Sequence, residues 1–341
     1  MIRVGIVGYG NVGRGAALAV DSNPDMELRA IFTRRDPGSI LGKTGDGKTG
    51  DGSLSYSPAG VRQRTVPCLT VQQAADMVDE IDVMLLCGGS AKDLLEQGPY
   101  FASMFNTVDS YDTHAKIPEY MASIDAVAKT RTAIISAGWD PGLFSMMRSL
   151  YEAILPVGKS YTFWGKGFSQ GHSDAMRQID GVKLAAQYTV PVESAVDAVR
   201  KGERPELTAR QKMKRECFVV TEPDSDEIKI KEAIINMPHY FADYDTTVSF
   251  IDTEEFLANH SKMPHGGMVL HSGSTGDNDH AMEFSLKLDS NPEFTGSIIA
   301  AYARAAYRMS KEGLFGAKTV FDVPLSYLAL KDRFDLIKEL M

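Results

Sequence analysis

The 341-residue chain has a formal net charge of −9, 43% hydrophobic residues and only three cysteines. The acidic balance argues against a protein that coats nucleic acid, and no apolar run approaches the roughly 20 residues of a membrane-spanning helix. Cys68, Cys87 and Cys217 lie far apart, so we expect neither a disulfide framework nor a bound metal. The chain opens on a strand-like segment without a signal-peptide pattern, which predicts a cytoplasmic globular protein with no nucleic-acid or membrane partner.

A glycine-rich loop follows the first predicted strand. The strand-like residues 2–7 and a helical stretch over 14–21 enclose the fingerprint Gly8-Tyr9-Gly10-Asn11-Val12-Gly13. Gly8 permits a tight turn, Gly10 lets the backbone approach a pyrophosphate, and Gly13 lets helix and strand pack closely. The amides at the helix N-terminus would then face the phosphates. This order predicts a dinucleotide-binding unit, with a merely structural glycine turn as the alternative.

The end of the second predicted strand, residues 27–32, indicates which dinucleotide binds. An NAD site usually places Asp or Glu there to accept the ribose 2′-hydroxyl, whereas this chain has Thr33-Arg34-Arg35. Two guanidinium groups and a hydroxyl suit a 2′-phosphate, because arginine offers a planar fork of donors. We therefore expect NADP as the cofactor. The alternative is a solvated basic loop in which Asp36 takes the role of the acid.

A second phosphate-type motif lies further along. Residues 42–49, Gly-Lys-Thr-Gly-Asp-Gly-Lys-Thr, match the P-loop pattern but lack a buried strand before them and a helix after them. We interpret them as a tandem duplication within a flexible insertion over about 37–66 and expect no nucleotide hydrolysis. The sequon at Asn259 is likewise expected to be unused.

Strand-like and helical segments then alternate. Short apolar strands are expected at 81–87, 106–109 and 132–137, with helices over 91–100 and 117–129. This alternation predicts an α/β fold with a Rossmann-type, doubly wound parallel sheet, whose ligands sit at the carboxyl ends of the strands. The segments at those ends are Cys87-Gly88-Gly89-Ser90, Asp109-Ser110-Tyr111-Asp112 and Gly138-Trp139-Asp140-Pro141-Gly142.

Two carboxylates stand out in these segments. Asp112 and Asp140 follow consecutive predicted strands, which places both at the expected nicotinamide end of the cofactor. A turn-forming role for Asp112 and a Pro-Gly turn or helix N-cap for Asp140 are the structural alternatives. Their joint placement favours a functional role.

The pattern changes after about residue 145. Helices over about 193–201 and 224–236 interrupt a series of strand-like segments, which predicts an α+β second domain with a mostly antiparallel sheet. The strand-like segments are 160–164, 185–191, 216–221, 246–251, 268–271 and 282–288.

The last part of the chain returns to helical spacing. Residues 294–312 are expected to form a helix that rejoins the first domain, and 327–341 to form a short amphipathic helix. We therefore expect a cofactor domain of residues 1–145 with 294–341, and a substrate and dimerisation domain of residues 146–293.

Two distinctive strings lie in the expected second domain: Ser169-Gln170-Gly171-His172-Ser173-Asp174-Ala175 and Met263-Pro264-His265-Gly266-Gly267. Further distinctive segments are residues 7–13, 32–35, 108–112, 138–145, Thr162-Phe163-Trp164-Gly165, Gln187-Tyr188-Thr189 and 214–220. With these segments the sequence resembles the meso-diaminopimelate dehydrogenase family over nearly the whole chain. The glycine-rich insertion departs from the family pattern, but it lies beyond Arg34 and Arg35.

The resemblance implies oxidative deamination at the D-centre of meso-2,6-diaminopimelate, giving L-2-amino-6-oxopimelate, ammonia and NADPH. It also implies the reverse amination, a place in lysine and cell-wall precursor metabolism, and a homodimer built through the second domain. By the same resemblance, the D-amino acid end of the substrate meets Asp112, Asp140, Trp164 and Asn291. The distal L-end meets Thr189, Arg215 and His265, and Gln170 with the Gly171 amide lines the middle.

The physical logic agrees with these assignments. A zwitterion with two ammonium and two carboxylate groups needs anionic and cationic partners, and Arg215 offers bidentate recognition of a carboxylate. Asp112, Asp140 or a water that they activate could act as the general base, and these alternatives stay open. Trp164 would exclude water, unless it is a plain core residue, and His265 would otherwise be structural. Broad specificity for D-amino acids and a non-catalytic NADP-binding sensor are the alternative functions.

Overall fold

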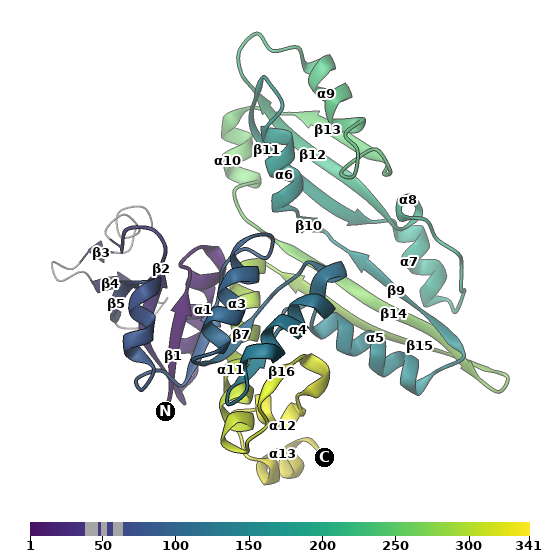
Figure 1. The fold of residues 1–341 in the computed structure, drawn as a ribbon. Helices are drawn as coiled ribbons and strands as arrows, with labels where there is room; N and C mark the ends of the chain where they lie inside the picture. Colours follow the sequence, from purple (N-terminus) through teal and green to yellow (C-terminus); the bar gives the residue numbers. More distant parts are fainter. Residues whose placement is uncertain (38–46, 49–52, 57–63) are drawn as a thin grey trace. The chain divides into compact units, whose positions relative to one another are not determined.

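The computed structural model describes residues 1–37, 47–48, 53–56 and 64–341 (Figure 1). These residues separate into two compact units. The first unit contains Met1–Met146 together with Pro292–Met341, and the second unit contains Met147–Asn291. None of the helices in the described ranges is long and apolar enough to cross a membrane.

The first unit is built on one sheet with the strand order β16-β8-β7-β6-β1-β2-β5-β4-β3. The seven strands from β16 to β5 are parallel, and β4 and β3 extend the edge in antiparallel pairing. The predicted parallel sheet is therefore confirmed. The strands are β1 (Ile2–Val7), β2 (Met26–Thr33), β3 (Gly47–Lys48), β4 (Ser53–Tyr56), β5 (Arg64–Thr70), β6 (Val83–Leu86), β7 (Asn106–Asp109), β8 (Thr132–Ile134) and β16 (Gly316–Lys318).

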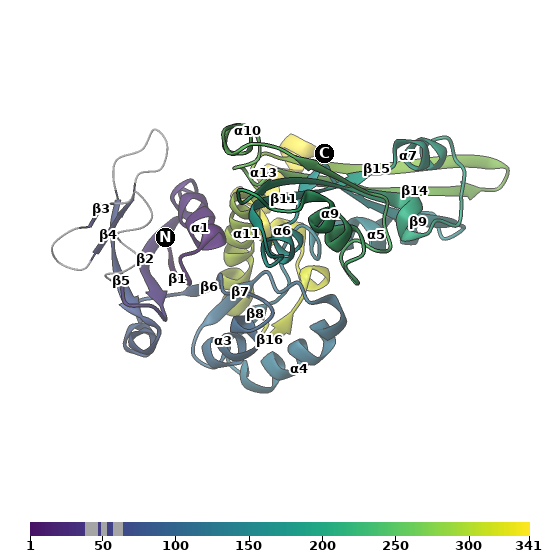
Figure 2. The ribbon, with the colours of Figure 1, turned by 90° about the horizontal axis from the view of Figure 1, so that it is seen from above.

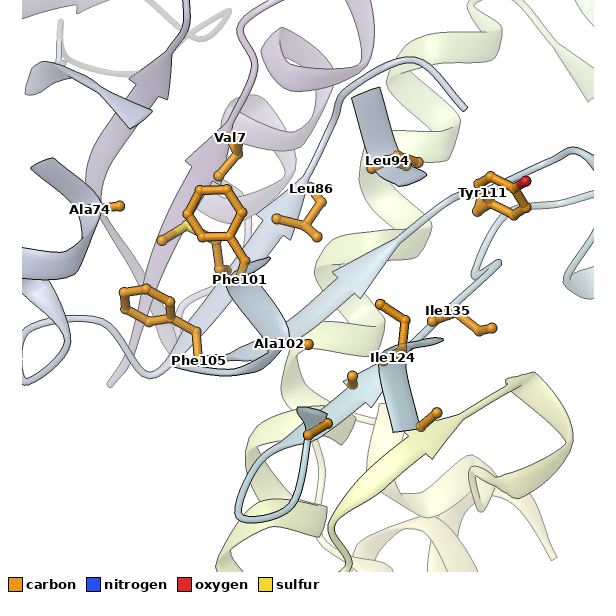
Figure 3. Packing of buried hydrophobic residues seen from close by; sticks show 14 of the residues in the cluster. Val7, Ala74, Leu86, Leu94, Phe101, Ala102, Phe105, Tyr111, Ile124 and Ile135 are labelled. Carbon is orange, nitrogen blue, oxygen red and sulfur yellow. The ribbon is translucent and has the colours of Figure 1, made fainter. Parts of the chain in front are cut away.

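Helices cover both faces of this sheet. Figure 2 shows α1 (Asn11–Asp21) and α11 (Asn291–Lys311) on one side of β6 and β7, with α3 (Asp93–Ala102) and α4 (Ile117–Val127) on the other. Because both faces are covered, β6 is buried along its whole length and its sequence is continuously apolar. Figure 3 shows part of the core on the α3–α4 side, where Phe101 of α3 packs with Val7 and Leu86 of the strands.

The edge of the sheet reaches into the segment that we interpret as a flexible insertion over about 37–66. β4 and the start of β5 lie within this segment. β5 buries Val66 and Cys68 on alternate positions and pairs with β2, so the sheet includes these residues. Apart from Gly47–Lys48, the P-loop-like segment 42–49 lies outside the described residues.

The C-terminal segment is also divided differently. One amphipathic helix over 327–341 was expected, whereas the structure contains α12 (Leu325–Leu328) and α13 (Arg333–Leu340). Asp332 explains why a new helix, α13, begins at Arg333, because its side chain accepts hydrogen bonds from the amide N–H groups of Phe334 and Asp335.

The second unit contains two smaller sheets, with the orders β10-β11-β12-β13 and β15-β14-β9. All neighbouring strands are antiparallel except the pair β12–β13. The predicted, mostly antiparallel α+β architecture is therefore confirmed. The strands are β9 (Gly158–Trp164), β10 (Gly167–Phe168), β11 (Val182–Pro191), β12 (Met213–Thr221), β13 (Thr246–Phe250), β14 (His265–Thr275) and β15 (Asn278–Leu288).

Three short helices of this unit were not predicted from the sequence: α6, α8 and α10. The α6 sequence is rich in Gly, Ser and Asp, which are poor helix formers, and it gains its stability by burying Ser173 and Met176 against β11. The helices are α6 (Gln170–Arg177), α7 (Glu193–Arg200), α8 (Ala209–Lys212), α9 (Glu227–Ile235) and α10 (Thr253–Asn259), and α5 (Leu143–Ile154) begins in the first unit and ends in the second. Short 3₁₀ turns, all in the first unit, are η1 (Val71–Met77), η2 (His114–Lys116) and η3 (Val320–Asp322).

Candidate functional site

A groove of about 420 Å³ lies at the carboxyl ends of β1, β2 and β6 in the first unit. Most of the residues predicted to bind a cofactor line it: Gly8, Tyr9, Gly10, Thr33, Arg34, Arg35, Cys87, Gly88 and Gly89. Asp93 and Gln97, one helical turn apart on α3, line it as well and were not predicted. Their sequence signal is a polar pair spaced four residues apart in the helix that follows a strand end.

The glycine fingerprint has the geometry that a phosphate cradle requires. Gly8 adopts a φ of +88°, which favours glycine. A Cβ on Gly13 would lie 2.0 Å from the carbonyl oxygen of Gly8, so only glycine permits this turn between β1 and α1. A Cβ on Gly10 would meet nothing within 4 Å, which leaves open space in front of the N-terminus of α1. Amides and the helix dipole favour an anion there.

Basic groups lie at the other end of the groove. Thr33 is buried and its Oγ1 accepts the amide N–H of Arg35 at 3.1 Å, which shapes the turn after β2. The side chain of Arg34 is 60% exposed, and its Nη2 lies 2.7 Å from Oδ1 of Asp93. Gln97 contributes a buried Oε1 that has no hydrogen-bond partner among the described residues. The open cradle, the unsatisfied acceptor and the two guanidinium groups together fit a dinucleotide.

Other predicted cofactor residues lie near the groove without lining it. Asn11 and Val12 stand in the first turn of α1, and Ser90 accepts the amide N–H of Asp112 at 3.1 Å. Ser110 follows β7. The ring of Tyr111 is fully buried and stacks on Tyr120, which leaves only its backbone for contact with a ligand.

A buried carboxylate joins the strand ends that carry Asp112 and Asp140. Oδ1 of Asp109 accepts the amide N–H groups of Tyr111 and Ser136 at 3.0 and 2.9 Å, and Oδ2 accepts the Tyr120 hydroxyl at 2.8 Å. Burial raises the pKa of Asp109 to about 6. This clip fixes the loops after β7 and β8 to one another.

The two predicted catalytic carboxylates follow these adjacent strands. Asp112 is exposed, and Asp140 is half-buried in the loop closed by the hydrogen bond from Gly138 N to Pro141 O. Since β7 and β8 are neighbours in a parallel sheet, both carboxylates belong to the same edge. Carboxylates at that edge can bind an ammonium group or accept its proton.

The second unit brings Thr189 and Arg215 together. Thr189 on β11 is the cross-strand partner of Arg215 on β12, and the guanidinium Nη1 donates to Oγ1 of Thr189. Arg215 is only 7% exposed, and its guanidinium lies 3.8 Å from the centroid of the Tyr244 ring. Its buried Nε has no hydrogen-bond partner among the described residues. Burial lowers the pKa of Arg215, so the site holds a desolvated cation that is suited to a carboxylate.

Gln187 and His172 were not in the predicted set, but each is linked to this pair, Gln187 through Thr189 and His172 through the charge of Arg215. Gln187 is fully buried two residues before Thr189, and its Nε2 lies 3.4 Å from Oγ1 of Thr189. Burial, with a smaller contribution from the charge of Arg215, lowers the pKa of His172 to about 4. The imidazole is therefore neutral at neutral pH.

His265 approaches the same strands from β14. The nearest atom of its ring would lie 2.5 Å from a Cβ on Gly167, so this glycine permits the close approach. Gly167 is in turn the cross-strand partner of Thr189. Burial lowers the pKa of His265, and its Nδ1 accepts the amide N–H of Gly266 at 2.8 Å. His265 also lines a cavity of about 470 Å³ that Thr189 and Arg215 do not line.

For the remaining predicted substrate residues, the structure gives the position in the fold. Trp164 ends β9 and is half-buried, and Gln170 and Gly171 are exposed at the start of α6. Asn291 begins α11, and its amide N–H donates to Met263 O at 3.0 Å. Among the described residues, no group of three or more His, Cys, Asp or Glu side chains could hold a metal ion.

Comparisons with known proteins identify the family of this chain. The family model named Diaminopimelic acid dehydrogenase C-terminal domain matches residues 138–290. The meso-diaminopimelate D-dehydrogenase of Lysinibacillus sphaericus is 55% identical over 343 residues, which cover 100% of this chain and 99% of the relative.

Two solved structures share the fold. The C. glutamicum DAP dehydrogenase in complex with DAP has a TM-score of 0.85 at 41% identity, covering 100% of this chain and 99% of that one. An engineered D-amino acid dehydrogenase bound to NADP+ has a TM-score of 0.80 at 40% identity, with the same coverage. With the match to the family model and the full-length identity to the L. sphaericus relative, these likenesses show that the chain belongs to the meso-diaminopimelate D-dehydrogenase family.

Proposed function

We propose that this chain catalyses the NADP-dependent oxidative deamination of meso-2,6-diaminopimelate at its D-centre, together with the reverse reductive amination. The products are L-2-amino-6-oxopimelate, ammonia and NADPH. The observation that carries this proposal is the buried guanidinium of Arg215, which is bound to Thr189 and has an unsatisfied Nε. Such a cation gains most from a ligand carboxylate, and a substrate with a second carboxylate far from its reacting centre supplies one.

Each unit contributes distinct chemistry. In the first unit, Asp112 and Asp140 would bind the D-ammonium group and orient the α-hydrogen for transfer. When bound in the groove, NADP supplies the hydride acceptor. The ammonium must lose a proton before hydride leaves, and water must then add to the imine carbon. Asp112, Asp140 or a water held by them could accept these protons.

In the second unit, Arg215 and Thr189 would hold the distal carboxylate of the substrate, with His265 near them. Gln187 helps to hold the Thr189 hydroxyl in place, because its side-chain Nε2 donates to that oxygen. Trp164, Asn291, Gln170 and the Gly171 amide complete the proposed substrate set.

We infer NADP, in preference to NAD, from the turn after β2. Arg34 and Arg35 are exposed at the groove, where an NAD site would carry a carboxylate. The first unit is the proposed cofactor domain, and the second the proposed substrate and dimerisation domain of a cytoplasmic homodimer in lysine and cell-wall precursor metabolism. Light scattering on the purified protein measures the assembly directly.

The test is a substrate and cofactor screen at alkaline pH. We expect NADPH formation with meso-diaminopimelate and much slower turnover with D-lysine or D-alanine, because a substrate without the distal carboxylate leaves Arg215 unpaired. Comparable rates on all three would support a broad D-amino acid dehydrogenase, the activity named for one structural neighbour. If the protein bound NADPH tightly but turned over none of these substrates, the result would support a non-catalytic NADP-binding sensor and contradict the proposed activity.

A further inference from the structure

A carboxylate of α3 occupies the basic end of the cofactor groove. Oδ1 of Asp93 pairs with Nη2 of Arg34 at 2.7 Å, and Oδ2 accepts the amide N–H of Gly89 at 3.1 Å. The Asp93 side chain is 22% exposed, much less than that of Arg34. Asp93 therefore contacts both Arg34, which is proposed to bind the 2′-phosphate, and the glycine loop that follows β6.

This placement changes the charge that a cofactor meets. The pairing compensates one of the two guanidinium groups at the groove, while no ion pair joins Arg35 to another described residue. A 2′-phosphate that binds Arg34 must displace Asp93 or share the guanidinium with it. In either case a dianion comes within a few ångströms of a carboxylate, and that repulsion weakens binding.

Asp93 is also held in place independently of Arg34. It lies in the first turn of α3, where the helix dipole favours a negative charge, and the Gly89 amide fixes its second oxygen. The carboxylate therefore stays at the groove when Arg34 turns toward a ligand. Because Arg34 stands where an NAD site carries its acid, Asp93 brings a carboxylate beside the position of the ribose 2′-hydroxyl.

We propose that Asp93 is a specificity-determining residue that limits the preference of the groove for NADP over NAD. It competes with the 2′-phosphate for Arg34, and it accepts a ribose hydroxyl when that phosphate is absent. This inference rests on the proposed dinucleotide function of the groove.

The test measures NADPH and NADH dissociation constants by fluorescence titration for the wild type and Asp93→Asn. Asparagine keeps an oxygen for the Gly89 amide and removes the charge. We expect NADPH to bind about threefold more tightly and NADH about threefold more weakly, as an exposed ion pair of ordinary strength implies. Glu96→Gln is the matched control, because Glu96 is exposed on the same helix, whereas the ion pair of Arg34 is with Asp93.

A second variant separates the two parts of the proposal. In an Arg34→Met background, Asp93→Asn should lose the part of its effect on NADPH that comes from competition for Arg34, so that effect becomes smaller, and it should keep its effect on NADH. An unchanged ratio of the two constants in Asp93→Asn, or an equal change in Glu96→Gln, would overturn the proposal while leaving the proposed function intact. Failure of the wild type to bind either dinucleotide would overturn both.

Discussion

The two units of this chain present guanidinium groups to solvent in opposite ways. In the first unit the Arg34 side chain is 60% exposed and is already paired with Asp93. In the second unit Arg215 is 7% exposed, lies against the Tyr244 ring and has a buried Nε without a hydrogen-bond partner among the described residues. Without a ligand, Arg34 is therefore hydrated and its charge is compensated by Asp93. Arg215 is already removed from water in the free protein, so most of the free-energy cost of its desolvation is incurred before a ligand binds.

This difference decides what each arginine can do under the proposed function. An exposed cation adds modest affinity that salt weakens, so it can adjust the preference between two similar cofactors. A buried cation with unsatisfied donors gains much more from the right anion, and leaves a large penalty when that anion is missing. We therefore expect strict selection at Arg215 and graded selection at Arg34.

The strongest test of the comparison is Arg215→Met. We expect kcat/KM for meso-diaminopimelate to fall about 100-fold or more, because the distal carboxylate would be buried without its partner. Rates with D-alanine should change little. Lys214→Met, at the exposed neighbouring position, is the control and should leave both rates unchanged. Unaltered selectivity in Arg215→Met would mean that the distal carboxylate is held elsewhere.

We expect a smaller loss of substrate affinity when Arg215 is kept and the Thr189 hydroxyl that it binds is removed. Thr189→Val keeps the shape of the side chain but removes the hydroxyl that accepts from Arg215. We expect KM for meso-diaminopimelate to rise about tenfold, as the loss of one hydrogen bond to a charged group implies. Thr189→Ser should restore most of the affinity in steady-state kinetics. If serine were no better than valine, the hydroxyl would have no part in holding Arg215.

The exposed pair should respond more weakly and in a salt-dependent way. Replacing Arg34 and Arg35 together by Met should raise the NADPH dissociation constant about tenfold at low salt and leave that for NADH nearly unchanged. Added salt should reduce this difference. Equal effects on both cofactors would remove the 2′-phosphate assignment, and a salt-independent effect would contradict the contrast between the two sites.

The mildest test uses His172 as a reporter of the Arg215 charge. Burial is the larger cause of its lowered pKa, and Arg215 adds to it. Arg215→Met should therefore raise the His172 pKa above about 4 while leaving it below the ordinary histidine value. Because the folded-state pKa is depressed, the stability contribution of neutral His172 is present above pH 6.5 and is lost as pH falls toward 4. An NMR titration of the ring that shows no change between the two proteins would mean that the guanidinium charge does not reach it.

Much of the first unit could be predicted from the sequence, because its determinants are local. Gly8 and Gly13 are needed by a turn that spans only a few residues, and β6 is a continuous apolar run since both of its faces are covered. Strand β5, which lies between β2 and β4, was not predicted, because Pro67 interrupts a short alternating pattern at the end of the insertion.

The partners of the key side chains could not be predicted in this way. Asp93 meets Arg34 across 59 residues of sequence, and Tyr244 meets Arg215 only through the pairing of β12 with β13. Gln187 carried the clearest available signal, since it shares a strand face with Thr189 at a spacing of two. Sequence motifs identified groups that can bind ligands, but the groups that modulate their charge come from distant segments.

The clip at Asp109 has a consequence for engineering this protein. One carboxylate fixes the loop that carries Asp112 and the loop that leads to Asp140, so the two loops share a single anchor. A substitution at Asp109 would shift both loops at once, and a gain in one would be confounded by a loss in the other. Libraries that redesign the reacting end of the substrate site should therefore vary each loop separately and leave this anchor and its Tyr120 partner unaltered.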